Sequence, residues 1–284
     1  MVICGLPGSG KTTFLAALWH LVTSREVETA LRFESLRNGD ASHLNALATR
    51  WCSAKIQDRT EMAGNRLVSM NLLGSGGNPV RLTFPDLSGE SYRRMWEDRD
   101  CDPAVAEILG TGEGVLLFVH ADQIQSAKSV VEVAAQSKKL GIAVGNGQDS
   151  PWSPRLAPTQ VQLVDLLQLL RLPPLNLEMQ RVAIMLSAWD KVAPENRTPE
   201  EFLAEWLPLF DQYLRSGADG WSWRVYGVSA QGGDYETQTK VMTNTQLANL
   251  DALRNLDQPS LRIKVVFEAT ESHDLTEPVA WLMS

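Results

Sequence analysis

The sequence predicts a three-layer α/β fold, in which helices cover both faces of a mostly parallel sheet that has one antiparallel edge strand. Two continuous apolar runs, Gly114–Val119 and Arg181–Leu186, are typical of strands that are buried on both faces. Helical patterns alternate with these runs along the chain, as they do in strand–helix–strand units. The 284 residues, of which 44% are hydrophobic, can form a sizeable core. No linker divides them, so we expect a single domain over residues 1–284.

The order of the elements follows from apolar periodicity and from the turn residues between the elements. The runs at 66–73 and 80–84 are joined by a turn rich in Gly, Asn and Pro, which predicts a hairpin. The Gly/Pro/Ser-rich segment 141–158 is expected to be a surface insertion. The remaining expected elements are strand 1–4, helix 11–23, a polar irregular stretch with one helix near 41–56, strand 114–119, helices 122–139 and 159–171, strand 181–186, helix 198–216, strand 222–228, a polar helix near 242–256, strand 261–267 and a helix near 276–283.

Composition argues against several classes of protein. The net charge is −8, from 26 basic and 34 acidic residues, which argues against a broad contact with nucleic-acid phosphates. Three widely spaced cysteines form neither a disulfide framework nor a zinc site. The four histidines, at positions 20, 43, 120 and 273, show no metal-ligand spacing and no Ser or Cys partner arrangement, so packing or surface positions are expected for them.

The sequence also predicts where the protein is found. No apolar run approaches the roughly 20 residues that span a bilayer, so no membrane span is expected. No secretory signal is visible either, and a cytoplasmic protein is expected. Only Met1–Cys4 remain for a first strand, so we expect either a domain of a longer protein or a protein trimmed to its minimum.

A glycine-rich motif follows the first strand. Residues Gly5–Thr12 match G-x-x-x-x-G-K-[ST], the Walker A or phosphate-loop pattern, of which about 0.01 matches are expected by chance in a chain this long. Its glycines let backbone N–H groups surround phosphate oxygens at the start of helix 11–23. Lys11 would reach the β- and γ-phosphates, and the Thr12 hydroxyl would bind Mg²⁺. The motif predicts a nucleoside-triphosphate site that includes Gly5, Pro7, Gly8, Ser9, Gly10, Lys11, Thr12 and Thr13.

The second motif, Asp86–Gly89, comes at the end of strand 80–84. A carboxylate at this position can hold Mg²⁺, and the N–H of Gly89 can approach the γ-phosphate. Glu90 stands where a water-orienting catalytic side chain could lie, although a solvated loop carboxylate explains it equally well. Asp and Gly also occur freely in turns, so the residue types alone are weak evidence. The position of the motif after the hairpin is what favours a functional interpretation.

A third phosphate contact is expected from the polar segment 24–65. Thr60 is our choice for a second Mg²⁺ ligand that also senses the γ-phosphate, because it directly precedes the hairpin. Thr29 and Thr49 lie in stretches with a helical pattern. A plain surface threonine is the alternative for Thr60. Arg59 beside it, or Arg93 or Arg94, could offset charge in the transition state, although an exposed arginine usually has no catalytic role.

Two further motifs concern the base. Strand 181–186 runs into Ser187–Lys191, where the carboxylate of Asp190 could accept hydrogen bonds from N1–H and N2–H₂ of guanine. Strand 222–228 runs into Ser229 and Ala230, where a backbone N–H could meet guanine O6. Together with the phosphate motifs, these elements resemble, in order and placement, the P-loop GTPases of the translation-factor-related (TRAFAC) class.

The layout is most similar to the bacterial double-GTPase domains of conflict and signalling operons. The residues that carry this resemblance are Gly5–Trp19, Asp86–Glu90 and His273–Pro278. Ser187 and Ala188 stand where related GTPases carry Asn or Thr and then Lys, so the lysine stem that packs on the base is missing. Trp189 or another tryptophan could stack there instead. Glu90 likewise replaces the glutamine with which many Ras-like enzymes place water.

The resemblance implies a Mg²⁺-dependent protein that binds GTP, hydrolyses it slowly and acts as a nucleotide-controlled switch with a protein effector or adaptor. An ATPase of the same fold is one alternative. A nucleotide-bound interaction module with negligible turnover is the other. Nucleotide preference distinguishes the first alternative, and single-turnover hydrolysis distinguishes the second.

Overall fold

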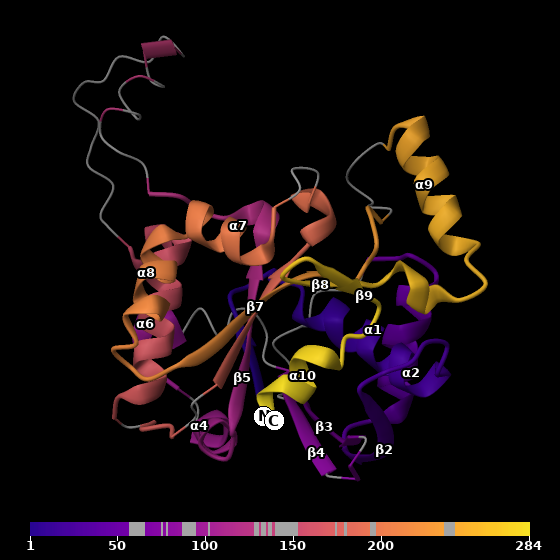
Figure 1. Ribbon diagram of the computed structural model, residues 1–284, viewed down its shortest axis with the longest axis horizontal. Helices are drawn as coiled ribbons and strands as arrows, with labels where there is room; N and C mark the ends of the chain where they lie inside the picture. The colour runs from indigo at the N-terminus through magenta and orange to yellow at the C-terminus, as the bar shows by residue number, and fades with distance from the viewer. Residues whose placement is uncertain are drawn as a thin grey trace.

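The computed structural model describes most of the chain and contains one continuous mixed sheet (Figure 1). The sheet has nine strands among the described residues, in the order β2-β3-β4-β1-β5-β6-β7-β8-β9. The described residues are 1–56, 66–74, 76–77, 79–86, 95–101, 103–127, 131, 135, 138–139, 153–173, 175–178, 181–193, 197–235 and 242–284.

Five parallel strands form the centre of the sheet. They are β4 (Pro79–Asp86), β1 (Val2–Gly5), β5 (Gly114–His120), β6 (Arg181–Ser187) and β7 (Ser222–Ser229). Strands β5 and β6 are the two continuous apolar runs, and nearly all of their side chains are buried because helices cover both faces. The predicted α/β class and the largely parallel core are therefore confirmed.

Antiparallel strands extend the sheet at both edges, two on each side, whereas the sequence predicted one antiparallel edge strand. On one side β2 (Leu31–Asn38) pairs with β3 (Arg66–Gly74), which forms the predicted hairpin with β4. On the other side β8 (Lys264–Phe267) and β9 (Thr270–Ser272) follow β7. Strand β2 was missed because two register shifts interrupt its pairing with β3, and bulges of this kind break the alternation of apolar and polar residues.

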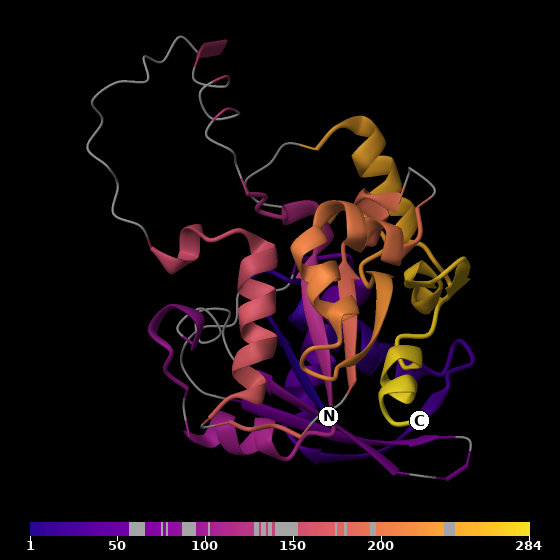
Figure 2. The ribbon, with the colours of Figure 1, turned by 60° about the vertical axis from the view of Figure 1, so that its left-hand side comes forward.

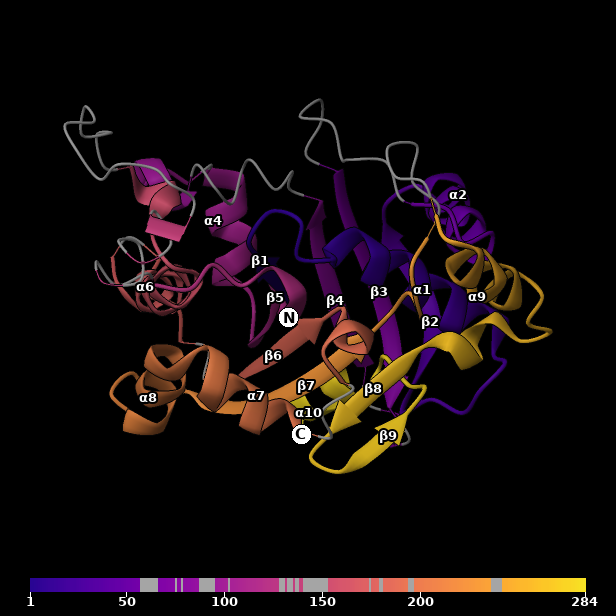
Figure 3. The same cartoon turned by 90° about the horizontal axis from the view of Figure 1, so that it is seen from above.

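Helices pack on both faces of the sheet and give the three predicted layers (Figures 1 and 3). One core cluster joins the sheet to α1 (Lys11–Ser24), α2 (Ala41–Cys52) and α10 (Glu277–Leu282). The second cluster joins the other face to α4 (Pro103–Gly110), α6 (Thr159–Arg171), α7 (Pro199–Trp206) and α8 (Pro208–Ser216). Figure 2 shows α6 and α10 on opposite sides of the sheet. Helix α9 (Asn244–Arg254) follows the capping residue Thr243.

Proline divides the predicted helix 198–216 into α7 and α8. Helix α7 begins with a capping box, in which the Thr198 side chain accepts from the Glu201 N–H and the Glu201 carboxylate accepts from the Thr198 N–H. It ends at Trp206, because Pro208 has no N–H to continue the hydrogen-bond ladder and restricts Leu207 before it. Pro208 then becomes the first residue of α8.

Other predictions are corrected locally. The helix predicted from residue 122 begins instead as the short 3₁₀ turn Ala121–Gln123, after which residues 124–127 are irregular. Thr29 lies outside any helix, whereas Thr49 lies within α2 as predicted. The expected strand 261–267 starts only at Lys264, after a 3₁₀ turn at Pro259–Arg262. Most of the predicted insertion 141–158 lies outside the described residues.

The two termini meet at the edge of the sheet opposite the carboxyl ends of the parallel strands (Figure 1). Met1 and Met283 line the same small cavity there. Within the described ranges, no helix has the length and apolarity that a bilayer crossing needs.

Candidate functional site

Those predicted site residues that the structure describes lie at the carboxyl ends of four parallel strands, at one edge of the sheet. The glycine-rich loop follows β1, and Asp86 ends β4 beside it. Asp190 comes just after β6, and Ser229 ends β7. This edge of a parallel sheet is where ligands bind in open α/β folds.

Three glycines give the loop after β1 its shape. Gly8 and Gly10 have φ angles of 72° and 86°, in the left-handed region that favours glycine. A Cβ atom on Gly5 would lie 2.5 Å from the carbonyl oxygen of Phe118 in the neighbouring strand β5, so no larger residue fits. These constraints account for the glycine spacing of the motif in physical terms.

Lys11 folds back over this loop. Its Nζ donates to the carbonyl oxygens of Gly5 and Leu6 at 2.8 and 2.9 Å, and it lies 3.2 Å from Ser9 Oγ. Burial lowers the pKa of Lys11 to about 8, although Cys4 beneath the loop acts in the opposite direction. Burial likewise raises the pKa of the Cys4 thiol to about 12. Lys11 is therefore an amine held by weak acceptors that a phosphate oxygen could replace.

Helix α1 presents an uncapped N-terminus to the same loop. Its N-cap is Gly10, which has no side chain to accept from the first N–H groups, and its first turn contains no acidic residue. A helix N-terminus without a capping side chain favours an anion, because its first N–H groups and the helix dipole point toward it. Thr12 and Thr13 are half-buried in the first turn.

The sequence assigns Thr12 and Asp86 to the same Mg²⁺ ion. Val2 of β1 pairs with Thr83 of β4, so Gly5 and Asp86, each three residues further on, lie level at the sheet edge. A hydroxyl and a carboxylate are among the oxygen ligands that Mg²⁺ prefers, so the chemistry of these two residue types suits the ion. The side chain of Asp86 and all of Thr60, Gly89 and Glu90 lie outside the part of the chain that the structure describes.

Asp190 and Ser229, the residues that the sequence assigns to base recognition, lie in direct contact. Asp190 Oδ1 accepts a hydrogen bond from Ser229 Oγ at 2.6 Å. Ser229 Oγ in turn accepts from the N–H of Gly232 at 3.2 Å. Lys191, next to Asp190, forms ion pairs with Asp122 and Asp234 at 3.8 and 3.3 Å. One carboxylate oxygen of Asp190 is thus fixed by the loop that follows β7.

Two close approaches connect the loop after β1 with the residues at the carboxyl ends of β5 and β6. A Cβ atom on Gly10 would lie 3.3 Å from the Cβ and Oγ of Ser187, which ends β6. Ser187 is the residue at the Asn/Thr position of the base motif, so this motif directly contacts the phosphate loop. A Cβ on Gly8 would lie 4.0 Å from Oε1 of Gln123, in the turn after β5.

Trp189 is not available to stack on a base. It is buried, and its ring makes an edge contact with Phe202 of α7 at 5.4 Å between centroids. A Cβ atom on Gly227 would lie 2.5 Å from the same indole, so β7 also closes over it. The stacking role suggested for Trp189 is therefore wrong, because the burial of its large apolar ring directs the side chain into the core.

Two residues at this edge were missed by sequence reasoning. The exposed Gln123 faces the phosphate loop, and His120 ends β5 with a buried Nδ1 that has no hydrogen-bond partner among the described residues. Burial lowers the pKa of His120, and Asp122 partly opposes this effect. Their signal was available in the sequence, because β5 is a buried parallel strand and its carboxyl end had to reach the same edge.

A histidine does have a cysteine partner, contrary to the sequence expectation. His20 Nδ1 lies 3.4 Å from Cys52 Sγ, and His20 Nε2 lies 3.0 Å from Glu26 Oε1. Burial raises the pKa of the Cys52 thiol, which keeps it protonated at neutral pH. We therefore interpret the cluster as a link between α1 and α2.

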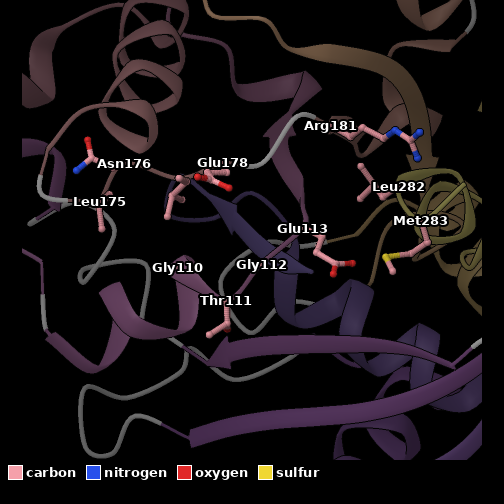
Figure 4. Close-up of a pocket in the computed structure, with 11 residues that line it drawn as sticks. Gly110, Thr111, Gly112, Glu113, Leu175, Asn176, Glu178, Arg181, Leu282 and Met283 are labelled. Atoms are coloured by element: carbon pink, nitrogen blue, oxygen red, sulfur yellow. The ribbon is translucent and has the colours of Figure 1, made fainter.

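A separate hollow of about 710 Å³ lies at the opposite edge of the sheet (Figure 4). Its lining includes Glu113, Glu178 and Arg181 but none of the predicted site residues. The Arg181 guanidinium donates to the carbonyl oxygens of Trp281 and Ser284 near the C-terminus. This hollow is distinct from the candidate nucleotide site.

A mixed sheet with a parallel core and a glycine-rich turn between β1 and α1 are typical of the class of nucleotide-binding α/β proteins. The family model described as Double-GTPase 1 matches residues 2–282, so the chain belongs to the Double-GTPase 1 family. The predicted resemblance to double-GTPase domains is thereby confirmed. No curated protein matches the chain.

One similar solved structure is the GTPase-like domain of Ski7 from S. cerevisiae, bound to GDP and inorganic phosphate. The TM-score is 0.43 and the sequence identity is 12%. The similarity covers 92% of this chain and 51% of that chain, so this chain spans about half the length of the other.

Proposed function

We propose that this protein binds GTP with Mg²⁺, hydrolyses it slowly and acts as a nucleotide-controlled switch. The observation that carries the proposal is the contact between Gly10 and Ser187, which places the phosphate loop and the Asp190 motif side by side. A nucleotide whose phosphates lie on the loop would extend its base toward Asp190.

The phosphate half of the site would work through backbone N–H groups and Lys11. Gly8 and Gly10 adopt left-handed conformations, as anion-binding turns do. A triphosphate would take Lys11 Nζ from the carbonyl oxygens of Gly5 and Leu6 and would raise the pKa of the amine, because a phosphate is a far stronger partner. Pro7, Ser9, Thr12 and Thr13 complete the proposed contacts.

The metal half would be formed by Thr12 and Asp86, with Thr60 as a further ligand. When bound, Mg²⁺ would supply positive charge that stabilises the charge developing in phosphoryl transfer. Gly89 would approach the γ-phosphate through its N–H, and Glu90 would orient the attacking water. Because Glu90 replaces the glutamine with which Ras-like enzymes place water, we expect turnover to be slow. A protein effector or adaptor would then accelerate it.

The base half would be formed by Asp190 with Ser229 and the backbone at Ala230. Asp190 would accept from the N1–H and N2–H₂ of guanine, whereas adenine presents an acceptor at N1. An unpaired carboxylate in a partly desolvated site costs on the order of 1–3 kcal/mol, which favours GTP by roughly 5- to 150-fold. We place this activity in a bacterial conflict or signalling system.

Titration of labelled GTP and ATP with and without Mg²⁺ tests the proposal. We expect tighter binding of GTP, dependence on Mg²⁺, and single-turnover hydrolysis above the spontaneous rate. Lys11→Ala should abolish triphosphate binding or hydrolysis in a folded protein, whereas Lys264→Ala, which removes an exposed lysine paired with Glu271, should change neither. Equal affinities for the two nucleotides would favour the ATPase, and absent turnover would favour an interaction module.

A further inference from the structure

We propose that Trp51 is a positioning residue for guanine recognition, because it fixes from helix α2 the loop that holds Asp190. This loop, residues 229–235, is called the base loop below. The inference rests on the proposed role of Asp190, and it adds a residue that lies in none of the nucleotide-binding motifs.

A single buried hydrogen bond makes the connection. Trp51 Nε1 donates to the carbonyl oxygen of Ala230 at 2.8 Å, across 179 residues of sequence. The Trp51 side chain is fully buried in the last turn of α2, so water cannot replace this donor. Ala230 directly follows Ser229, whose hydroxyl donates to Asp190. The indole and the carboxylate therefore hold the base loop at two adjacent residues.

Trp51 is itself fixed against the rest of the base loop by a buried arginine. The guanidinium of Arg262 lies 3.7 Å from the centroid of the Trp51 ring and donates to the Trp51 carbonyl oxygen. Tyr235, at the end of the base loop, also donates to that carbonyl at 3.4 Å. A Cβ on Gly232 would lie 2.7 Å from Arg262, so the loop packs directly against the arginine.

This arrangement determines the direction of a backbone donor. In a trans peptide the C=O and the following N–H point in opposite directions, so holding the Ala230 carbonyl also orients the N–H of Gln231. If the indole N–H is removed, a buried carbonyl loses its partner and the base loop can shift to recover one. A shift would disturb the Ser229–Asp190 hydrogen bond, and with it the discrimination of guanine from adenine.

The test compares two tryptophan-to-phenylalanine variants that each lose one indole N–H. Trp51→Phe removes the donor to Ala230, whereas the control Trp19→Phe removes a donor to Asn45 Oδ1, also 2.8 Å long and also to α2. We expect Trp51→Phe to raise the Kd for GTP about 5- to 10-fold, with little change for ATP, because the phosphate loop is untouched. Trp19→Phe should leave the ratio of the affinities for GTP and ATP (the GTP/ATP ratio) unchanged, even where both variants lower the melting temperature equally.

A second variant keeps the proposal testable if Trp51→Phe does not fold. Tyr235→Phe removes only the hydroxyl that donates to the Trp51 carbonyl, and it should lower the GTP/ATP ratio about twofold. A Trp51→Phe protein that keeps the wild-type ratio, or a Trp19→Phe protein that loses it equally, overturns the inference. Failure of the proposed function differs, because the wild-type protein would then show no preference for GTP.

Discussion

Ser229 donates a hydrogen bond of 2.6 Å to Asp190, although 39 residues separate them in the sequence. The two residues follow neighbouring parallel strands, β7 and β6, and meet because both strands end at the same edge. One oxygen of the carboxylate is thereby held in place, which leaves its orientation defined before a ligand arrives.

Ser229→Ala should weaken GTP binding about 3- to 10-fold through the loss of one hydrogen bond to a charged group, and it should leave ATP binding nearly unchanged. Competition titrations with the two nucleotides measure this difference. Ser222→Ala, on the exposed start of the same strand, is the matched control. An equal loss for both nucleotides would show that Ser229 supports the fold and not the base.

Triphosphate affinity should decrease as the pH rises through the pKa of Lys11. Burial lowers that pKa to about 8, and only the protonated amine attracts phosphate. Affinity should therefore be highest below pH 8 and fall about fourfold between pH 7 and 8.5, with net proton uptake on binding. Calorimetry in two buffers of different ionisation enthalpy measures the uptake.

Lys11→Arg provides the comparison, because a guanidinium stays protonated throughout this range. Its affinity for the triphosphate, whatever its absolute value, should show no decline between pH 7 and 8.5. A decline of the same size in both proteins would assign the titration to another group.

Gly227→Ala should reduce the free energy of unfolding by about 1–3 kcal/mol, because the new methyl group would overlap the buried Trp189 indole. Since Trp189 precedes Asp190, the GTP/ATP ratio should also fall. Gly110→Ala, where the methyl group would have no neighbour within 4 Å, should be neutral or slightly stabilising. Chemical denaturation of the two variants provides the measurement, and equal stability would contradict the packing argument.

The sequence was sufficient for those parts of the fold that local rules decide. Strands β5 and β6 were predicted because a strand covered on both faces needs a continuous apolar run. The tight turn between β1 and α1 was predicted from the motif that contains Gly5 and Gly10, and the structure shows a close backbone approach at Gly5 and a positive φ angle at Gly10. The break between α7 and α8 could also have been predicted from Pro208, which interrupts the helical hydrogen bonds. It was missed because apolar periodicity continues on both sides of the proline.

The remaining features depend on contacts between distant segments. Trp51 reaches Ala230 only after α2 and β7 are assembled in the fold, and no pattern near either residue indicates it. The burial of Trp189 likewise depends on Phe202 and on Gly227, from two different elements. The composition of a tryptophan-containing turn cannot distinguish a ring that stacks on a ligand from one that packs in the core.

The most direct test of the account is the nucleotide preference of Asp190→Asn. The asparagine amide can donate to the 2-oxo group of xanthine, which a carboxylate would repel, so the variant should lose affinity for GTP and gain affinity for xanthosine triphosphate. Competition of GTP, ATP and xanthosine triphosphate against one labelled nucleotide gives all three constants in the same experiment. A reversal of preference from GTP to xanthosine triphosphate is the predicted result, and an unchanged order of the three affinities would contradict guanine recognition by Asp190.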